Sequence, residues 1–195
     1  MSFPLIVISG PAGVGKTTVV KALRKMYPEL CSSVTYTTRA PRNYSVEDKI
    51  MHYVSKMEFE KRRDNGEFLE WAVVHGDFYG THRLETEDLL QNNPVIFNID
   101  VQGAEQIKEL YGPRVLTIFL LPESHEQMVD HIKKRGEMTD GSFAARLKSA
   151  EMELSRQDKF DYKIVNHEGQ LHETIEQIQT ILAPILPIDQ ARVDK

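Results

Sequence analysis

Short apolar runs recur along the chain, with polar segments of helical spacing between most of them. The runs lie at residues 5–9, 71–75, 95–100, 114–120 and 162–165. Runs of this length rich in Val, Ile and Leu are typical of buried strands. The last helical segment carries one apolar stripe, formed by Leu171, Ile175, Ile178 and Leu182. Alternating strands and helices predict an α/β fold, with a mostly parallel sheet, helices on both faces and ligands at the carboxyl ends of the strands.

Two segments interrupt this alternation, a polar one at residues 35–81 and a basic, helix-rich one at residues 131–147. Both are interpreted as insertions over the strand ends. The core is then expected to comprise residues 1–34, 82–130 and 148–187. Pro184 and Pro187 are expected to end the last helix, which leaves residues 188–195 as a frayed tail.

Length and charge narrow the class of protein. The 195 residues suffice for one α/β core with small insertions but not for two large domains. With 24 basic and 29 acidic residues, the net charge of -5 gives no overall field that attracts nucleic acid or an anionic membrane. Cys31, the only cysteine, excludes an internal disulfide and fits the cytoplasm. The first apolar run leads straight into a glycine loop and is expected to be a buried strand, neither signal peptide nor membrane span. A homodimer is left open.

A phosphate-binding loop follows the first run. The pattern G-x-x-x-x-G-K-[ST] is matched by Gly10, Pro11, Ala12, Gly13, Val14, Gly15, Lys16 and Thr17. Its backbone N–H groups and the start of the next helix, at Thr18, would surround a phosphate. Lys16 would reach the β and γ phosphates, and Thr17 would offer its hydroxyl to Mg²⁺. The loop predicts binding of Mg-ATP as phosphoryl donor; the simpler alternative is a glycine turn capping an ordinary helix.

Two arginines mark a second phosphate site. Arg39 and Arg42 flank Pro41, and their planar guanidinium groups suit the oxygens of a phosphate. Taken alone, the pair is better explained as solvated arginines on a surface loop. Further segments give it a context, and they lie at residues 33–42, 68–71, 78–81, 99–103 and 134–136.

In order and spacing, these segments and the phosphate loop resemble guanylate kinases over about residues 4–183. The resemblance implies a P-loop NTPase-type parallel-sheet core with a GMP-binding domain inserted at residues 35–81 and a helical lid at residues 131–147. It also implies transfer of a phosphoryl group from ATP to GMP or dGMP. The residues implied in GMP binding are Thr35, Arg39, Arg42, Glu70, Tyr79, Thr81 and Asp100.

The implied roles divide that set by chemistry. Arg39, Arg42 and Tyr79 would hold the acceptor phosphate, while Thr35 and Thr81 would donate toward guanine O6. Glu70 and Asp100 would accept from guanine N1–H and the 2-amino group. Guanine presents two adjacent donors and one acceptor, which carboxylates and hydroxyls complement, whereas adenine would leave a carboxylate facing the N1 lone pair.

The remaining implied roles concern transfer itself. The residues that would offset charge on the transferred group are Lys16, Arg39, Arg135 and Arg146. The two lid arginines, Arg135 and Arg146, would close over the γ phosphate and exclude water. Asn166 resembles the adenine-side residue of the family, although His167 follows where the family has an acid.

Three positions depart from the family pattern. Met51 replaces a tyrosine that helps to hold the acceptor phosphate, so either Tyr53 or His52 substitutes or the site is weaker by about 1 kcal/mol. Asn98 replaces an aspartate expected to organise magnesium, which keeps the shape and removes the charge. His131 lies near the position of a lid arginine, and a histidine lacks the permanent charge of an arginine.

These departures keep two alternatives to an active guanylate kinase open. One is a binding module that kept the fold and lost catalysis, which the complete loop at residues 10–17 opposes. The other is a kinase retuned to a different phosphorylated small molecule, which Met51 favours because it alters the acceptor pocket.

Overall fold

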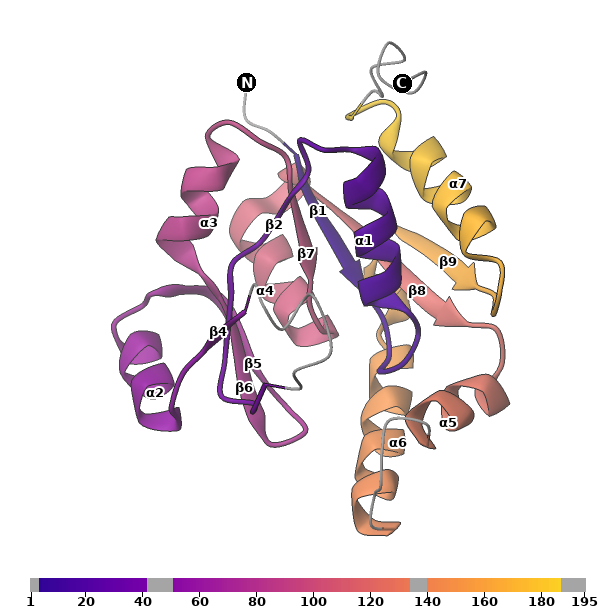
Figure 1. Cartoon of the computed structure of the whole chain (residues 1–195), viewed down its shortest axis with the longest axis horizontal. Coiled ribbons are helices and arrows are strands. Elements are labelled where there is room, and N and C mark those ends of the chain that lie inside the picture. The colour runs from indigo at the N-terminus through magenta and orange to yellow at the C-terminus, as the bar shows by residue number, and fades with distance from the viewer. Residues whose placement is uncertain (1–3, 42–50, 134–139, 187–195) are drawn as a thin grey trace.

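A computed structural model describes residues 4–41, 51–133 and 140–186, which form two sheets and the helices around them (Figure 1). The larger sheet has five strands in the order β2-β7-β1-β8-β9, and all its neighbours pair in parallel. Its strands are β1 (Leu5–Ser9), β2 (Cys31–Ser32), β7 (Val95–Asn98), β8 (Val115–Pro122) and β9 (Tyr162–Asn166). The central strand β1 therefore lies between β7 and β8, and the phosphate loop follows it.

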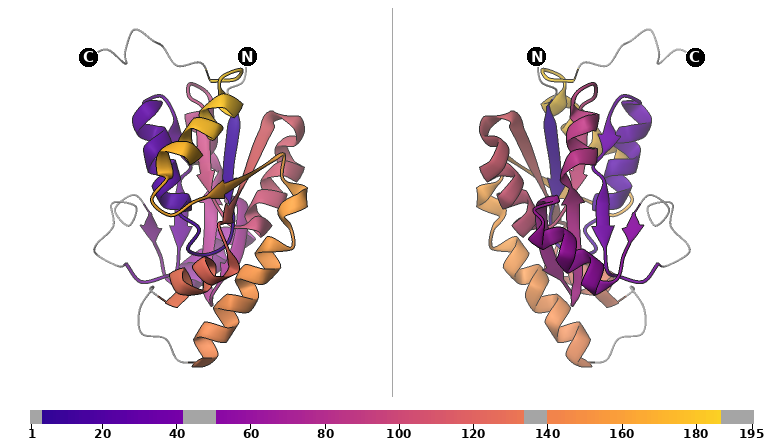
Figure 2. Two further views of the ribbon diagram at one scale, coloured as in Figure 1. Left: turned by 90° about the vertical axis from the view of Figure 1, so that its right-hand side faces the viewer. Right: turned by 90° about the vertical axis from the view of Figure 1, so that its left-hand side faces the viewer.

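Helices cover both faces of this sheet, as the sequence predicts (Figure 2). Ile6 and Ile8 of β1 pack on one face with α1 (Lys16–Met26) and α7 (Leu171–Leu182). Leu5 and Val7 pack on the other with α3 (Arg83–Leu90) and α4 (Val101–Tyr111). Successive side chains of a strand point to opposite faces, so a sheet buried on both sides reads as a continuous apolar run.

A second sheet lies beside the first, in the order β4-β3-β6-β5. Its strands are β3 (Thr35–Thr37), β4 (His52–Tyr53), β5 (Phe68–Val74) and β6 (Asp77–His82). The apolar run at residues 71–75 is a strand, but it belongs to this smaller sheet, where β5 and β6 pair antiparallel. Helix α2 (Lys56–Asp64) packs on the sheet through the buried Phe59.

The remaining helices lie near the carboxyl ends of the parallel strands. Helices α5 (His125–Lys133) and α6 (Asp140–Leu154) pack together through Met128, Ile132 and Ala150, and α6 projects away from the large sheet (Figure 1). Two short 3-10 turns, Gly112–Arg114 and Gln157–Lys159, precede β8 and β9. Helix α7 ends just before Pro184, while Pro187 and residues 188–195 lie outside the described residues. Within the described ranges, no helix combines the length and apolar character that crossing a membrane requires.

Candidate active site

The phosphate loop joins β1 to α1 and turns through left-handed backbone conformations. Gly13 and Gly15 have φ values of 89° and 95°, which residues other than glycine rarely adopt. A Cβ on Gly15 would also lie 2.6 Å from Nδ2 of Asn166. Gly15 is the N-cap of α1, and no side chain among the described residues caps this end of the helix. The first N–H groups of α1 are thus available for an anion, as the sequence motif predicts.

Lys16 and Thr17 form the first turn of α1. The Lys16 ammonium donates to the backbone carbonyls of Gly10 and Pro11, so its side chain curls over the loop. The Thr17 hydroxyl accepts from Nδ2 of Asn98, at 3.1 Å, at the carboxyl end of β7. The described residues contain no group of three or more His, Cys, Asp or Glu side chains that could hold a metal ion. A hydroxyl beside a neutral amide suits Mg²⁺ only when nucleotide phosphates supply most of the ligands.

Two side chains brace the phosphate loop from outside. Asn166 donates through Nδ2 to the carbonyl of Val14 at 2.8 Å, and its Oδ1 accepts from the Thr174 hydroxyl at 2.8 Å. Nδ1 of His131, on α5, lies 3.0 Å from the carbonyl oxygen of Gly13. Asn166 and His131 therefore both contact the loop backbone, a support that sequence reasoning did not foresee.

Glu70 is the central residue of the second half of the site. The register between β5 and β6 shifts between Phe68 and Glu70, an irregularity of the bulge type, and Leu69 packs into the core of the large sheet. The Glu70 side chain is only 4% exposed, and its carboxylate accepts from the Thr81 hydroxyl at 2.6 Å. Thr35 pairs with Thr81 across β3 and β6. The structure thus brings together three of the residues predicted to bind the base.

Asp100 completes this group from the large sheet. It caps α4, accepting through Oδ1 from the N–H of Gly103 at 2.9 Å. A Cβ on Gly103 would lie 2.4 Å from Oε2 of Glu70, so the glycine lets the Glu70 carboxylate approach the first turn of α4. Burial raises the pKa of the Glu70 carboxyl to about 7, and the negative charge of Asp100 acts in the same direction.

Arg39 and Tyr79 lie at the same end of the small sheet. Tyr79 on β6 pairs with Thr37 on β3, two residues before Arg39. Nη2 of Arg39 donates to the Tyr53 hydroxyl at 3.4 Å, and the guanidinium lies 5.8 Å from the centre of the Tyr53 ring. Of the two residues expected to compensate for Met51, Tyr53 is the one that contacts Arg39.

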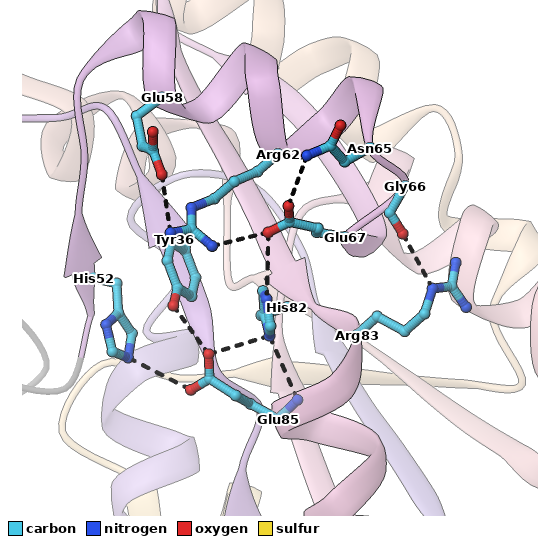
Figure 3. A network of polar contacts seen from close by, with 10 residues as sticks. All are labelled: Tyr36, His52, Glu58, Arg62, Asn65, Gly66, Glu67, His82, Arg83 and Glu85. Carbon is cyan, nitrogen blue, oxygen red and sulfur yellow. Dashed lines mark hydrogen bonds and ion pairs between the residues drawn. The ribbon is translucent and has the colours of Figure 1, made fainter.

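His52 points elsewhere, into a polar network behind the acceptor strands (Figure 3). Its ring stacks on Tyr36 at 4.5 Å, and the Tyr36 hydroxyl donates to Glu85 at 2.9 Å. His82 lies between Glu85, at 3.1 Å, and Glu67, at 3.8 Å. Tyr36 is on the face of β3 opposite to Thr35. This network links β3, β4 and β6 to α3 and fixes the strands that carry the threonines.

Of three further expected arginines, the structure describes only Arg146. Arg42 and Arg135 lie outside the described residues. Arg146 is half-buried on α6, and it forms no hydrogen bond or ion pair with any residue that the structure describes.

The structure thus contains a phosphate loop after β1 and a buried carboxylate beside the start of α4, and comparison with known proteins agrees with this arrangement. A family model described as guanylate kinase matches residues 3–184. A guanylate kinase of Clostridium tetani is 40% identical over 192 residues, which are 98% of this chain and 88% of the relative. The chain belongs to the guanylate kinase family.

Solved structures agree with this membership of the guanylate kinase family. The crystal structure of guanylate kinase from Anaplasma phagocytophilum superimposes with a TM-score of 0.72 at 31% identity, and the match covers 95% of this chain and 87% of that one. A shikimate kinase from Bacteroides thetaiotaomicron matches with a TM-score of 0.52 at 14% identity, over 93% of this chain and 99% of that one, and shows a shared fold alone. Guanylate kinases are ATP-using enzymes, and the predicted P-loop kinase fold is confirmed.

Proposed function

We propose that this chain transfers the γ-phosphoryl group of Mg-ATP directly, in line, to the phosphate of GMP or dGMP, giving ADP and GDP or dGDP. The observation that carries the proposal is the buried Glu70 carboxylate. It accepts a hydrogen bond from the Thr81 hydroxyl and lies against the first turn of α4 beside Asp100. Two neighbouring carboxylates suit a base with two neighbouring donors. In this proposal residues 35–81 form the acceptor domain and residues 131–147 the lid.

Selection of guanine depends on the charged form of Glu70. With a pKa of about 7, the carboxyl is partly protonated before the acceptor binds. Guanine N1–H and the 2-amino group donate to the charged form and stabilise it. Adenine has no N1–H, so its N1 lone pair would face a charged carboxylate that is shielded from solvent. Stranding such a buried group costs roughly 1 to 3 kcal/mol, and more when it is charged.

Transfer depends on positioning and on charge compensation. The loop N–H groups and Lys16 hold the donor phosphates, and we assign to Arg39, after β3, a bridge between donor and acceptor phosphates. We assign Arg42 to the acceptor phosphate, and Arg135 and Arg146 to closure over the γ phosphate. Mg²⁺, near Thr17 and Asn98, would neutralise charge on the β and γ oxygens.

The direct test is phosphoryl transfer by the purified chain. ADP formation from ATP is followed with GMP, dGMP, AMP, CMP, UMP or no acceptor, and with Mg²⁺ compared with Mn²⁺. The proposal expects rapid turnover with GMP and dGMP and slow turnover with the others. A folded protein that binds ATP but transfers to none of them would refute it and favour a binding module. Turnover with AMP, CMP or UMP above that with GMP would indicate a kinase with another acceptor.

A further inference from the structure

Strand β5, which carries Glu70, lies at the edge of the small sheet. An edge strand presents backbone N–H and C=O groups that no neighbouring strand satisfies. At Trp71, directly after Glu70, one side chain of α4 satisfies both groups. The Trp71 N–H donates to Oε1 of Gln106 at 3.2 Å, and Nε2 of Gln106 donates to the Trp71 carbonyl at 2.9 Å.

The same amide also ties back to its own helix. Nε2 of Gln106 donates to the carbonyl of Gln102 at 3.2 Å, one turn earlier in α4. Two opposed hydrogen bonds to a single residue fix both the position of β5 along its axis and its rotation, which a single bond cannot do. Gln106 therefore takes the place of a neighbouring strand and holds β5 on α4.

This attachment joins the two elements that carry the Glu70 and Asp100 carboxylates. Asp100 caps the helix that carries Gln106, and Glu70 precedes the residue that Gln106 binds. The carboxylate of Glu70 also packs against Gly103 of the same helix, where a Cβ would come within 2.4 Å of it. Movement of β5 along α4 would thus change the separation of Glu70 from Asp100.

We infer that Gln106 is a positioning residue for acceptor selection, because it sets the spacing between the Glu70 and Asp100 carboxylates. The inference rests on the proposed function, in which these carboxylates read guanine. The Trp71 ring has no part in it. That ring is partly exposed and contacts the Arg63 guanidinium, at 5.2 Å, and the Phe78 ring, at 6.2 Å.

The test compares GMP with inosine 5′-monophosphate, which keeps N1–H and O6 and lacks the 2-amino group. An enzyme with correctly spaced carboxylates prefers GMP, whereas one with displaced carboxylates loses part of that preference. For Gln106→Ala we expect KM for GMP to rise about tenfold, the worth of one or two hydrogen bonds. The preference for GMP over inosine 5′-monophosphate should fall, while KM for ATP stays within about twofold.

Two further variants separate positioning from general stability. Gln91→Ala removes an exposed glutamine at the end of α3 whose side chain bonds to none of the described residues, and should leave every constant unchanged. Gln106→Glu keeps an acceptor for the Trp71 N–H but sets a carboxylate oxygen against the Trp71 carbonyl. It should reproduce the loss of GMP selection even if Gln106→Ala does not fold.

The outcomes separate the inference from the function on which it rests. If the wild-type chain does not phosphorylate GMP, the proposed function fails and the inference fails with it. If the wild type is active but neither folded Gln106 variant changes KM for GMP or the preference over inosine 5′-monophosphate, only the positioning role is refuted. A parallel rise in KM for ATP and GMP would also overturn it, since that result indicates general loosening of the fold.

Discussion

In the proposed function, the donor and acceptor halves of the site would bind by different means. The donor half is one continuous loop whose ligands are backbone N–H groups at the start of α1, with Lys16 added. The acceptor half collects side chains from β3, β5, β6 and the start of α4, and at its centre is a carboxyl group removed from water. The first half depends on backbone conformation, and the second on the exact relation between two sheets.

This difference indicates where each half is sensitive to change. A backbone-built anion site tolerates many side chains at its variable positions, provided that its glycines remain. A pocket built on a buried carboxylate gains selectivity because a wrong base leaves charge unpaired, and it is sensitive to small displacements. Substitutions should therefore separate donor effects on turnover from acceptor effects on KM and on pH dependence.

The largest effect is expected for Lys16→Ala in the donor half. Loss of the ammonium that we propose to pair with the β and γ oxygens should lower kcat by about 10³-fold or more, as removal of charge-compensating groups does in phosphoryl transfer. The affinity for GMP, measured by calorimetry without ATP, should stay within about twofold. Full activity of this variant would show that the loop does not serve transfer.

The next largest effect is expected for Glu70→Gln in the acceptor half. An amide has one acceptor oxygen and no negative charge, so it cannot accept from both guanine N1–H and the 2-amino group as a carboxylate does. KM for GMP should therefore rise by about 10- to 100-fold, as expected for loss of a charged hydrogen bond. KM for ATP should not change. An equal rise in both constants would mean that Glu70 supports the fold and does not read the base.

Glu70 also predicts a pH dependence that the same variant removes. Guanine binds to the charged carboxylate, and the pKa of Glu70 in the folded protein is about 7. The value of kcat/KM for GMP should therefore fall roughly tenfold per pH unit below 7. The phosphate of the substrate GMP also titrates, near pH 6, and it does so equally in assays of the wild type and of Glu70→Gln. The difference between the two pH profiles of kcat/KM therefore reports the Glu70 carboxyl group alone.

Stability should change with pH in the opposite direction. Between pH 4.5 and about 7 the folded protein holds a proton that the unfolded chain releases, so the free energy of unfolding falls as pH rises, by roughly 1 kcal/mol per unit. Urea unfolding without nucleotide across this range should show that slope in the wild type and a smaller one in Glu70→Gln. Equal slopes would contradict the raised pKa.

The same difference explains how far the sequence could predict the molecule. The phosphate loop is contiguous and has a fixed spacing, so its residues and the start of α1 followed from the sequence, as did the parallel sheet from its apolar runs. The small sheet gave almost no periodic signal, because β3 and β4 have three and two residues and carry polar side chains. The hydrogen bonds of Gln106 to Trp71 join residues that are 35 positions apart, and no local sequence pattern predicts them.

A smaller effect is expected for Gly103→Ala, which acts on the contact between the two halves of the pocket. A methyl group at this position would lie 2.4 Å from Oε2 of Glu70 and must displace that carboxylate or the strand that carries it. We expect a loss of about 1 to 3 kcal/mol in the free energy of unfolding, which is typical of overpacking. KM for GMP should rise about tenfold with kcat nearly unchanged. An unaltered KM would show that Glu70 moves freely there.

The smallest effect concerns the phosphate end of the acceptor half, where Met51 replaces a tyrosine and Tyr53 contacts Arg39. If Tyr53 has taken over the missing role, Tyr53→Phe should raise KM for GMP by about two- to fivefold, the worth of one weak hydrogen bond, and leave the preference over inosine 5′-monophosphate intact. Met51→Tyr in the Tyr53→Phe background should then restore KM, because a hydroxyl returns to the same end of the pocket. Recovery in the double variant would show that the family's phosphate contact has moved by two residues, from 51 to 53. A rise in KM that Met51→Tyr does not reverse would instead limit Tyr53 to supporting the Arg39 side chain.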